Sequence, residues 1–468
     1  MSLRRLACLV AAAAILATVS PAAAFTLGPQ NLQLLSVKQL SPRLQELTMK
    51  TAALPGDTHV RVLLPAGYDA SAPKRYPVLY LLNGALDNET SWTLKGDAEK
   101  ITAPFPLIVV MPDGGTDGGY TDWYNYGKGG PPMWETFHIG QLLPWIDAHF
   151  RTTGTRAGRA VAGLSMGGGG AFSYAARFPD LFVAAAAFSG AVDTNNLEVQ
   201  PLTETAGIQD GHPDQSPFGD RVVDEIRWRG HNPWDLAENL RGLDLTMRTG
   251  NGLPGGPGGD TGDPVEAGVH EESVSMHEQL LRFGIPHLWD DYGPGGHAWY
   301  YWQRDLRQLM PALTKTFSHP PAAPRRITYK TIQPVYDVFG WHVAIKRPAL
   351  EFSELRDADR GGFAVTGSGS ATVTTPRLFA ARQTVAVQVV SGQGIQDSRV
   401  HADRKGRLTL ALTLGPGNSY QAYSPQARLA ALASAPARPL GRPDDLLAGT
   451  LSYTASVTLS AACRKPCR

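Results

Sequence analysis

The first two thirds of the chain alternate continuous apolar runs with amphipathic stretches. The apolar runs at 77–82, 106–111 and 183–189 are typical of strands that are buried on both faces. Amphipathic stretches at 134–149 and 301–317 predict helices between and after such strands. Apolar strands that alternate with helices predict a parallel sheet covered by helices on both faces.

Shorter patterns complete this sheet. Alternating residues at 47–51 and 59–64 predict an antiparallel hairpin that leads into it. Further strands are predicted at 161–163, 243–249 and 286–290. In a parallel sheet the carboxyl ends of the strands meet at one edge, so we expect the functional residues there.

The pattern changes at the proline-rich stretch 319–324, which predicts a linker. Beyond it, short alternating segments separated by glycines predict an all-β, sandwich-like module that ends with a strand near 451–459. The Ala/Pro-rich stretch 429–443 predicts no regular element. We therefore expect a catalytic domain at 25–318, a linker at 319–326 and a β-rich domain at 327–468.

The N-terminus resembles a secretory leader. Arg4 and Arg5 precede an apolar stretch at 6–19, and small residues at 21–24 offer a cleavage site. We expect a signal peptide at 1–24 and a secreted protein, located outside the cell or in the cell envelope. No later stretch is long and apolar enough to predict a transmembrane segment.

Composition narrows the possible partners. With 43% hydrophobic residues and a formal net charge of +1, the chain can bury a large core and gives no reason to expect nucleic acid or an anionic membrane as a partner. Cys463 and Cys467 predict either a small disulfide or two free thiols, and they lack the histidines of a zinc site. The glycine-rich stretch 250–262 lacks the Lys-Ser/Thr of a phosphate-binding loop. We expect no metal and no cofactor.

A long polar and aromatic insertion occupies 191–239, between two predicted core strands. Long insertions in compact domains usually serve function, so we expect a cap over the catalytic edge. The alternative is a surface loop without a role.

The strongest motif lies at 161–168, where Gly163, Ser165 and Gly167 form a G-x-S-x-G pattern. A strand precedes the serine, and a helix of small residues follows it. This context predicts a sharp strand-to-helix turn that presents the Ser165 hydroxyl as a nucleophile. The turn needs flanking residues that are nearly free of side chains.

A serine nucleophile needs a base, and the base needs an orienting acid. His297 follows the last predicted strand on a glycine-rich loop, which favours it over His287 within that strand. The acid should follow the strand at 243–249, and the pattern alone does not separate the candidates there, which are Asp260, Asp263, Glu266, Glu271 and Glu272. Two backbone N–H groups should bind the oxyanion, and we predict those of Met166 and Ala85.

Several short stretches resemble, in order, the secreted mycolyltransferases and their esterase D-type relatives. They are 81–84, 120–124, 134–137, 163–167, 250–252 and 297–302, and the similarity covers roughly 47–314. The resemblance implies an α/β-hydrolase fold with a Ser-Glu-His triad. It places the triad on Ser165, Glu266 and His297, the oxyanion donors on Ala85 and Met166, and substrate contacts on Asn83 and Trp299. It implies acyl transfer, onto trehalose lipids in the best-known branch.

These observations predict an α/β-hydrolase with an added β-sandwich and the activity of a serine esterase or acyltransferase. The expected substrate is a small-molecule or lipid acyl ester, with water or a sugar hydroxyl as acceptor. The alternative from another class is a non-catalytic secreted binding protein on a hydrolase scaffold, which would lack a member of the triad. The acyl chain and the acceptor stay open, because the family's Asp-Gly-Leu-Arg turn is Asn-Gly-Ala-Leu at 83–86 in this chain.

Overall fold

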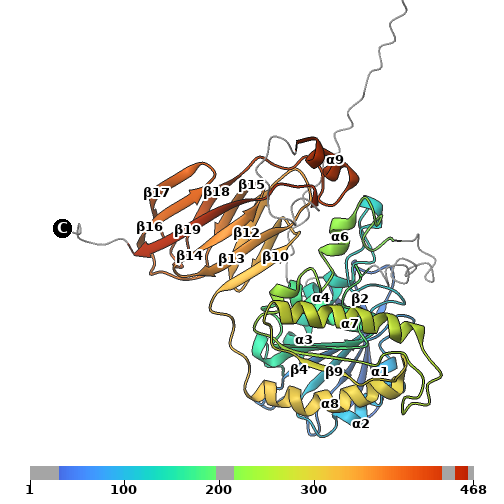
Figure 1. Ribbon diagram of the computed structural model, residues 1–468. Coiled ribbons are helices and arrows are strands. Elements are labelled where there is room, and N and C mark those ends of the chain that lie inside the picture. The colour runs from blue at the N-terminus through green and yellow to red at the C-terminus, as the bar shows by residue number, and fades with distance from the viewer. Residues whose placement is uncertain (1–30, 197–214, 435–447, 462–468) are drawn as a thin grey trace, which may run out of the picture.

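The computed structural model describes residues 31–196, 215–434 and 448–461. They build an α/β half, which ends at Ser318, and a β half, which begins at Ile327, lying side by side (Figure 1). The leader predicted at 1–24 and the cysteines Cys463 and Cys467 lie outside the described residues. Within the described part of the chain, no helix combines the length and apolarity needed to cross a membrane.

One sheet forms the centre of the α/β half. Its strands are β1 (Gln33–Gln39), β2 (Leu44–Lys50), β3 (Thr58–Leu63), β4 (Val78–Leu82), β5 (Ile108–Pro112), β6 (Arg159–Leu164), β7 (Ala184–Phe188), β8 (Asp244–Thr249) and β9 (Leu288–Asp291). Their order in the sheet is β1-β2-β3-β5-β4-β6-β7-β8-β9. The pairs from β1 to β5 are antiparallel and the pairs from β5 to β9 are parallel, which confirms the predicted hairpin and parallel sheet.

Helices cover both faces of this sheet, and each face has its own apolar core. The longer helices are α3 (Leu143–His149), α4 (Met166–Arg177), α7 (Pro264–Arg282) and α8 (Trp299–Ser318), and the shorter ones are α1 (Ser91–Leu94), α2 (Ala98–Thr102) and α6 (Glu225–Arg229). The helices α3, α4 and α7 pack on one face, while α1, α2 and α8 pack on the other (Figure 1). The helix predicted at 134–149 starts as a wide π-helical turn, η2 (Thr136–Leu142), and continues as α3. Short 3-10 turns occur at η1 (Asn125–Gly127), η3 (Arg156–Gly158) and η5 (Ala237–Leu240).

Two antiparallel sheets stack in the β half around a shared apolar core, in agreement with the predicted sandwich. One sheet has the order β10-β13-β14-β19-β16-β17 and the other β11-β12-β15-β18. The strands are β10 (Ile327–Thr331), β11 (Val335–Val338), β12 (Trp341–Lys346), β13 (Ser353–Asp359), β14 (Gly362–Gly367), β15 (Gly369–Thr374), β16 (Thr384–Ser391), β17 (Gly394–His401), β18 (Thr409–Gly415) and β19 (Tyr453–Ala461). The helix α9 (Pro425–Ser434) corrects the expectation of no regular element from 429 onward, because its alanines and leucines favour helix until the prolines begin.

Direct contacts between side chains and backbone join the two halves, in addition to the connecting segment. The Tyr329 hydroxyl on β10 donates to the carbonyl of Arg177 at the end of α4, at 2.7 Å. The side chain of Asn239 bonds the backbone of Lys330 twice, through its amide nitrogen and its oxygen. A small apolar cluster also joins Ile226 of α6 to Ile332 of the β half.

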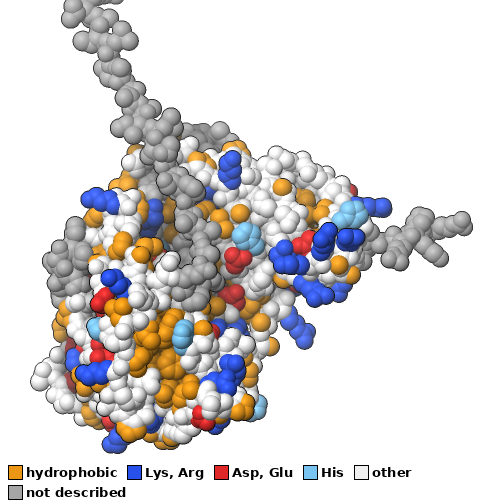
Figure 2. All heavy atoms as spheres, turned by 180° about the vertical axis from the view of Figure 1, so that it is seen from behind, with side chains coloured by type: hydrophobic (Ala, Val, Ile, Leu, Met, Phe, Trp, Pro, Cys, Tyr) orange, Lys and Arg blue, Asp and Glu red, His pale blue; other side chains and the backbone are white. Residues whose placement is uncertain are grey.

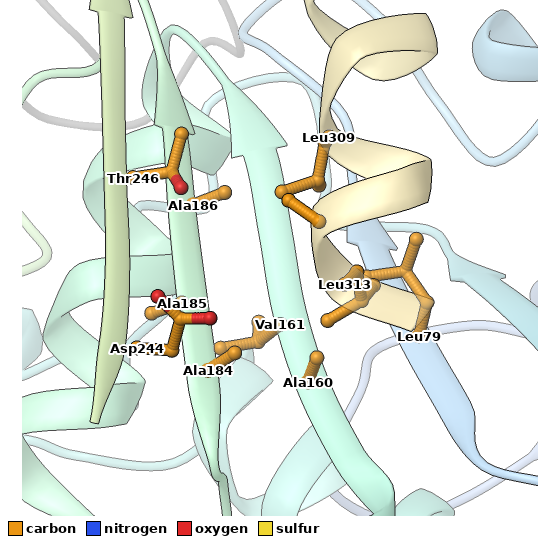
Figure 3. Close-up of a pocket in the computed structure, with 11 residues that line it drawn as sticks. Leu79, Ala160, Val161, Ala184, Ala185, Ala186, Asp244, Thr246, Leu309 and Leu313 are labelled. Atoms are coloured by element: carbon orange, nitrogen blue, oxygen red, sulfur yellow. The ribbon is translucent and has the colours of Figure 1, made fainter. Parts of the chain in front are cut away.

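A small hollow lies under α8, between this helix and β4, β6, β7 and β8 (Figure 3). Ala160, Ala184 and Asp244, which line it, stand at the amino ends of their strands. Its volume of about 10 Å³ suits a single water at most. The hollow is therefore a packing gap left by the small side chains of β7, at the opposite edge of the sheet from Ser165.

Candidate active site

Ser165 occupies the tight turn between β6 and α4. Its backbone angles, φ 53° and ψ −123°, are strained for a residue with a side chain. A Cβ on Gly163 would lie 2.3 Å from the carbonyl oxygen of Gly167, and one on Gly167 would lie 2.4 Å from that of Asn83. Both positions therefore require glycine, which is the physical reason for the spacing around the serine.

The turn after β4 lies against this serine. A Cβ on Gly84 would be 3.3 Å from the Cβ of Ser165. The next residue, Ala85, and the first residue of α4, Met166, have backbone N–H groups that donate to no acceptor among the described residues. Two unpaired donors beside one serine hydroxyl are the arrangement that an oxyanion hole requires.

His297 lies on the loop between β9 and α8. Its Nδ1 is 2.7 Å from Oε2 of Glu266, which belongs to the first turn of α7. The indole of Trp302 meets the imidazole edge to face, with 4.9 Å between ring centroids. The carboxylate and the indole together fix the orientation of the ring.

The carboxylate of Glu266 is completely buried. Its Oε1 accepts hydrogen bonds from the backbone N–H of Gly250 at 2.7 Å, from Ser189 Oγ at 2.8 Å and from Thr249 Oγ1 at 3.2 Å. These donors compensate the cost of burying a carboxylate. They also occupy one oxygen, so the other faces His297.

The other candidate acids have different partners. The Asp263 carboxylate caps α7 by accepting the N–H groups of Val265 and Glu266, and it accepts the backbone N–H of His297 at 2.7 Å. Burial would raise the pKa of Asp263, but these hydrogen bonds and the nearby imidazole hold it below its usual value. Asp263 thus positions the histidine loop through the backbone.

The remaining candidates lie further from the imidazole. Asp260 accepts the hydroxyl of Tyr301, and Glu271 lies beside His270 with its side chain half exposed. Glu272 is buried and accepts the backbone N–H of Asp193 at 3.1 Å. Of the five carboxylates, the structure brings that of Glu266 to the imidazole of His297.

The two residues expected at the substrate take supporting positions. The Asn83 side chain is 1% exposed, donates to the carbonyl of Gly84 and accepts from the Tyr120 hydroxyl, so it holds the turn from inside. Trp299 packs edge to face between Trp92 and Trp302 and remains partly exposed. The structure therefore places Trp299, and not the Asn83 amide, where a ligand could reach it.

Sequence reasoning assigned no role to Ser189 or Trp302. Ser189 follows β7 with a positive φ of 45°, bonds Glu266 and receives the indole N–H of Trp302 at 3.3 Å. A polar residue at the carboxyl end of a buried strand was the available signal for Ser189. Trp302 lay within a matched stretch, but its contact with the imidazole depends on how α8 packs.

The described parts of the insertion form a wall along the loop that begins at Tyr120, whose hydroxyl donates to the carbonyl of Asn83 in the turn beside the serine. Backbone N–H groups of Tyr124 and Asn125 donate to the carbonyls of Pro217 and Ser216, both at 2.9 Å. The guanidinium of Arg227 lies over the Tyr124 ring at 3.6 Å. This wall meets the loop that begins at Tyr120, whose ring packs on Gly170 of α4. Residues 197–214 of the predicted cap lie outside the described residues.

Comparison with known proteins agrees with this geometry. Residues 51–313 match the model of the Esterase family. Esterase Rv1288 of Mycobacterium tuberculosis is 34% identical over 279 residues, which are 57% of this chain and 58% of the esterase, so the chain spans little more than half of that relative. The diacylglycerol acyltransferase/mycolyltransferase Ag85B of Mycobacterium leprae is 30% identical over 52% of this chain and 77% of that protein.

A solved structure of Mycobacterium tuberculosis MPT51 is similar at a TM-score of 0.49 and 23% identity, over 59% of this chain and 100% of the other. The match to the family model covers more than half of the 468 residues. The family model and the mycolyltransferase relative confirm the predicted resemblance to esterases and mycolyltransferases, and the sheet order and helix layers are those of an α/β-hydrolase. The chain belongs to the Esterase family.

Proposed function

We propose that this protein is a secreted serine esterase or acyltransferase that works through an acyl-enzyme. The observation that carries the proposal is the 2.7 Å contact between His297 Nδ1 and the buried Glu266, at the sheet edge where Ser165 stands on a strained turn. The family supplies the reaction class, ester hydrolysis or acyl transfer. The roles of the individual residues are part of the proposal.

In this mechanism the Nδ1–H of His297 donates to Glu266, which leaves Nε2 unprotonated and able to act as a base. Neither Nε2 nor the Ser165 hydroxyl has a hydrogen-bond partner among the described residues. Catalytic hydrogen bonds are commonly long in free enzymes and shorten when substrate binds.

The serine oxygen attacks the ester carbonyl while its proton passes to Nε2. The oxyanion that forms accepts hydrogen bonds from the N–H groups of Ala85 and Met166. The alcohol then leaves with the proton from the imidazolium, and an acyl-Ser165 ester remains. Water or a second hydroxyl attacks this ester with His297 again as base, which returns the serine.

The expected substrate is a small-molecule or lipid acyl ester, and a sugar hydroxyl is the proposed acceptor when transfer competes with hydrolysis. Partly exposed aromatic surface at Trp299, close to the histidine loop, supports a ligand with an apolar or sugar-ring face. The proposed mechanism uses no metal and no cofactor.

The test combines labelling with turnover. Wild-type protein treated with a fluorophosphonate should gain one adduct by intact mass spectrometry, located on Ser165 by peptide mapping. Ser165→Ala should gain none and should lose hydrolysis of short p-nitrophenyl esters by at least about 10³-fold. Labelling at another serine, or near-normal turnover by Ser165→Ala, would reject the proposed nucleophile.

A further inference from the structure

Basic side chains gather at one end of the β half, on loops that are far apart in the sequence. Figure 2 shows Lys and Arg side chains clustered at this end. We define the cationic end by the exposed residues Arg360, Arg377, Arg382, Arg404, Lys405 and Arg407. They come from the β13–β14 turn, the β15–β16 loop and the β17–β18 loop.

The backbone holds these loops together. The N–H groups of Leu378 and Phe379 both donate to the carbonyl of Gly406, at 3.2 and 3.1 Å, and Arg382 donates its N–H to the carbonyl of Asp403. Gly406 has a φ of 78°, and a Cβ there would lie 2.1 Å from the carbonyl oxygen of Phe379. These contacts therefore fix the backbone of the two loops that carry five of the six cations.

The charge at this end is largely uncompensated. Asp403 pairs with Arg407 at 2.9 Å, and Asp359, which directly precedes Arg360, pairs with Arg326 outside this set at 3.2 Å. Arg360 lies 5.8 Å from the ring of the buried Phe379. The six cations and Asp403 leave a local charge of +5, to which the Asp359–Arg326 pair adds nothing, although the whole chain carries only +1. A cluster of this density attracts anions over about one Debye length, ~8–10 Å at physiological salt.

The chemistry of the cationic end indicates its partner. Five of the six cations are arginines, whose guanidinium groups bind phosphate oxygens in pairs. No exposed aromatic ring lies in the described loops 376–383 and 402–408, so bases of a single-stranded nucleic acid would find no stacking surface. No exposed large apolar side chain is present there either, which favours contact with headgroups over insertion into the acyl layer.

We propose that the cationic end adsorbs the protein to the phosphate headgroups of an anionic lipid membrane. The inference does not depend on the proposed chemistry, because Ser165 lies in the α/β half. Adsorption to such a surface would hold an esterase near lipid-borne acyl esters. The net charge of the whole chain gave no reason to expect such a partner, and the argument for it rests on the local charge of this end.

The test is co-sedimentation with vesicles of phosphatidylcholine alone and of phosphatidylcholine mixed with phosphatidylglycerol. The wild type should bind the mixed vesicles, bind neutral ones far less, and release when salt is raised. A variant with Arg377→Gln, Arg382→Gln, Arg404→Gln and Lys405→Gln should bind roughly 600-fold more weakly, since each cation near an anionic surface contributes about fivefold.

A matched control removes the same charge from exposed, scattered sites through Lys38→Gln, Lys50→Gln, Arg282→Gln and Lys315→Gln. It should bind within about threefold of the wild type if position matters more than net charge. Ser165→Ala should bind normally, which separates this test from that of the active site. Both charge variants should melt and hydrolyse a soluble ester as the wild type does.

Three outcomes would overturn the proposal. One is equal binding of wild type to neutral and anionic vesicles, or no binding to either. Another is equal loss of binding in the two charge variants. The third is tighter binding to duplex DNA than to anionic vesicles at the same phosphate concentration, which would assign the cationic end to nucleic acid.

Discussion

The Glu266→Gln substitution tests the proposed acid because it removes the charge and keeps the shape. Three donors converge on Oε1 of Glu266, and one of them, the backbone N–H of Gly250, can act only as a donor. A glutamine must therefore turn its carbonyl oxygen to this site. Its NH₂ group then faces Nδ1 of His297, where Oε2 accepts a hydrogen bond in the wild type.

This orientation reverses the tautomer of the histidine. An NH₂ group at 2.7 Å requires Nδ1 to accept, so the ring proton moves to Nε2. A protonated Nε2 cannot take the proton of the Ser165 hydroxyl. The cost of the wrong tautomer in other serine triads predicts a fall in kcat of ~10³–10⁴-fold, about 4–5.5 kcal/mol of transition-state stabilisation.

The assay is kcat for p-nitrophenyl butyrate, with the melting temperature followed by circular dichroism. Glu266→Gln should keep nearly the wild-type melting temperature, since its carbonyl oxygen retains the Gly250 contact. The control is Glu271→Gln, whose side chain is 51% exposed, and it should turn over normally. A natively folded Glu266→Gln protein with kcat within about tenfold of the wild type would refute the assignment of Glu266 as the triad acid.

Two further predictions concern stability. Burial raises the pKa of Glu272 from 4.5 to about 8. Below pH 4.5 this carboxyl is protonated in both the folded and the unfolded chain and does not reduce the free energy of unfolding. That free energy falls as the pH rises from 4.5 through 8, because the unfolded chain ionises first. Relative to the wild type, Glu272→Gln should gain on the order of 2–4 kcal/mol between pH 5 and 8 in urea titrations, and a pH-independent difference would contradict this. A chain that ends at His319 should keep esterase turnover but melt roughly 5–10 °C lower by calorimetry, because it loses the contacts of Tyr329 and Ile332. Loss of turnover while the full chain is active would show that the β half completes the site.

The local parts of the site could be predicted from sequence because short-range sterics fix them. The turn at Ser165 needs Gly163 and Gly167 for clearances of 2.3 and 2.4 Å, and such a demand leaves a visible pattern. The buried strands were likewise visible as continuous apolar runs. Their order in the sheet depends on pairing between strands that are distant in the sequence, and no single run predicts it.

The acid could not be separated from its neighbours by pattern, because rotation about α7 and the helix cap decide which carboxylate faces the imidazole. Asp263 lies three residues before Glu266 and would pass any test of spacing, but its oxygens serve the cap and the backbone of His297. Ser189 was hidden for a similar reason. Its partner Glu266 is 77 residues away, and that distance closes only when β7 and β8 pair.

The cationic end of the β half could not be predicted either, because it too depends on residues that are distant in the sequence. Arg360, Arg377 and Arg404 lie far apart in the sequence with mostly uncharged residues between them, so a scan for long basic runs does not find the cluster. They meet because the turns of an antiparallel sandwich fall at its two ends. Net charge averages over the whole surface, whereas a binding partner responds to the charge within one Debye length.

The segment 319–324 has the composition of a linker. The wall formed by the described insertion nevertheless contacts residues of both the α/β half and the β half. In the α/β half, the backbone N–H of Tyr124 donates to the carbonyl of Pro217. On the side of the β half, Gln421 donates to the carbonyl of Val223, and Arg428 pairs with Glu225 at 2.6 Å. The helix α6 contacts both halves, since Arg227 lies over the Tyr124 ring and Glu225 pairs with Arg428. The described insertion therefore contacts both halves, and its contacts with the β half join residues more than 190 positions apart in the sequence.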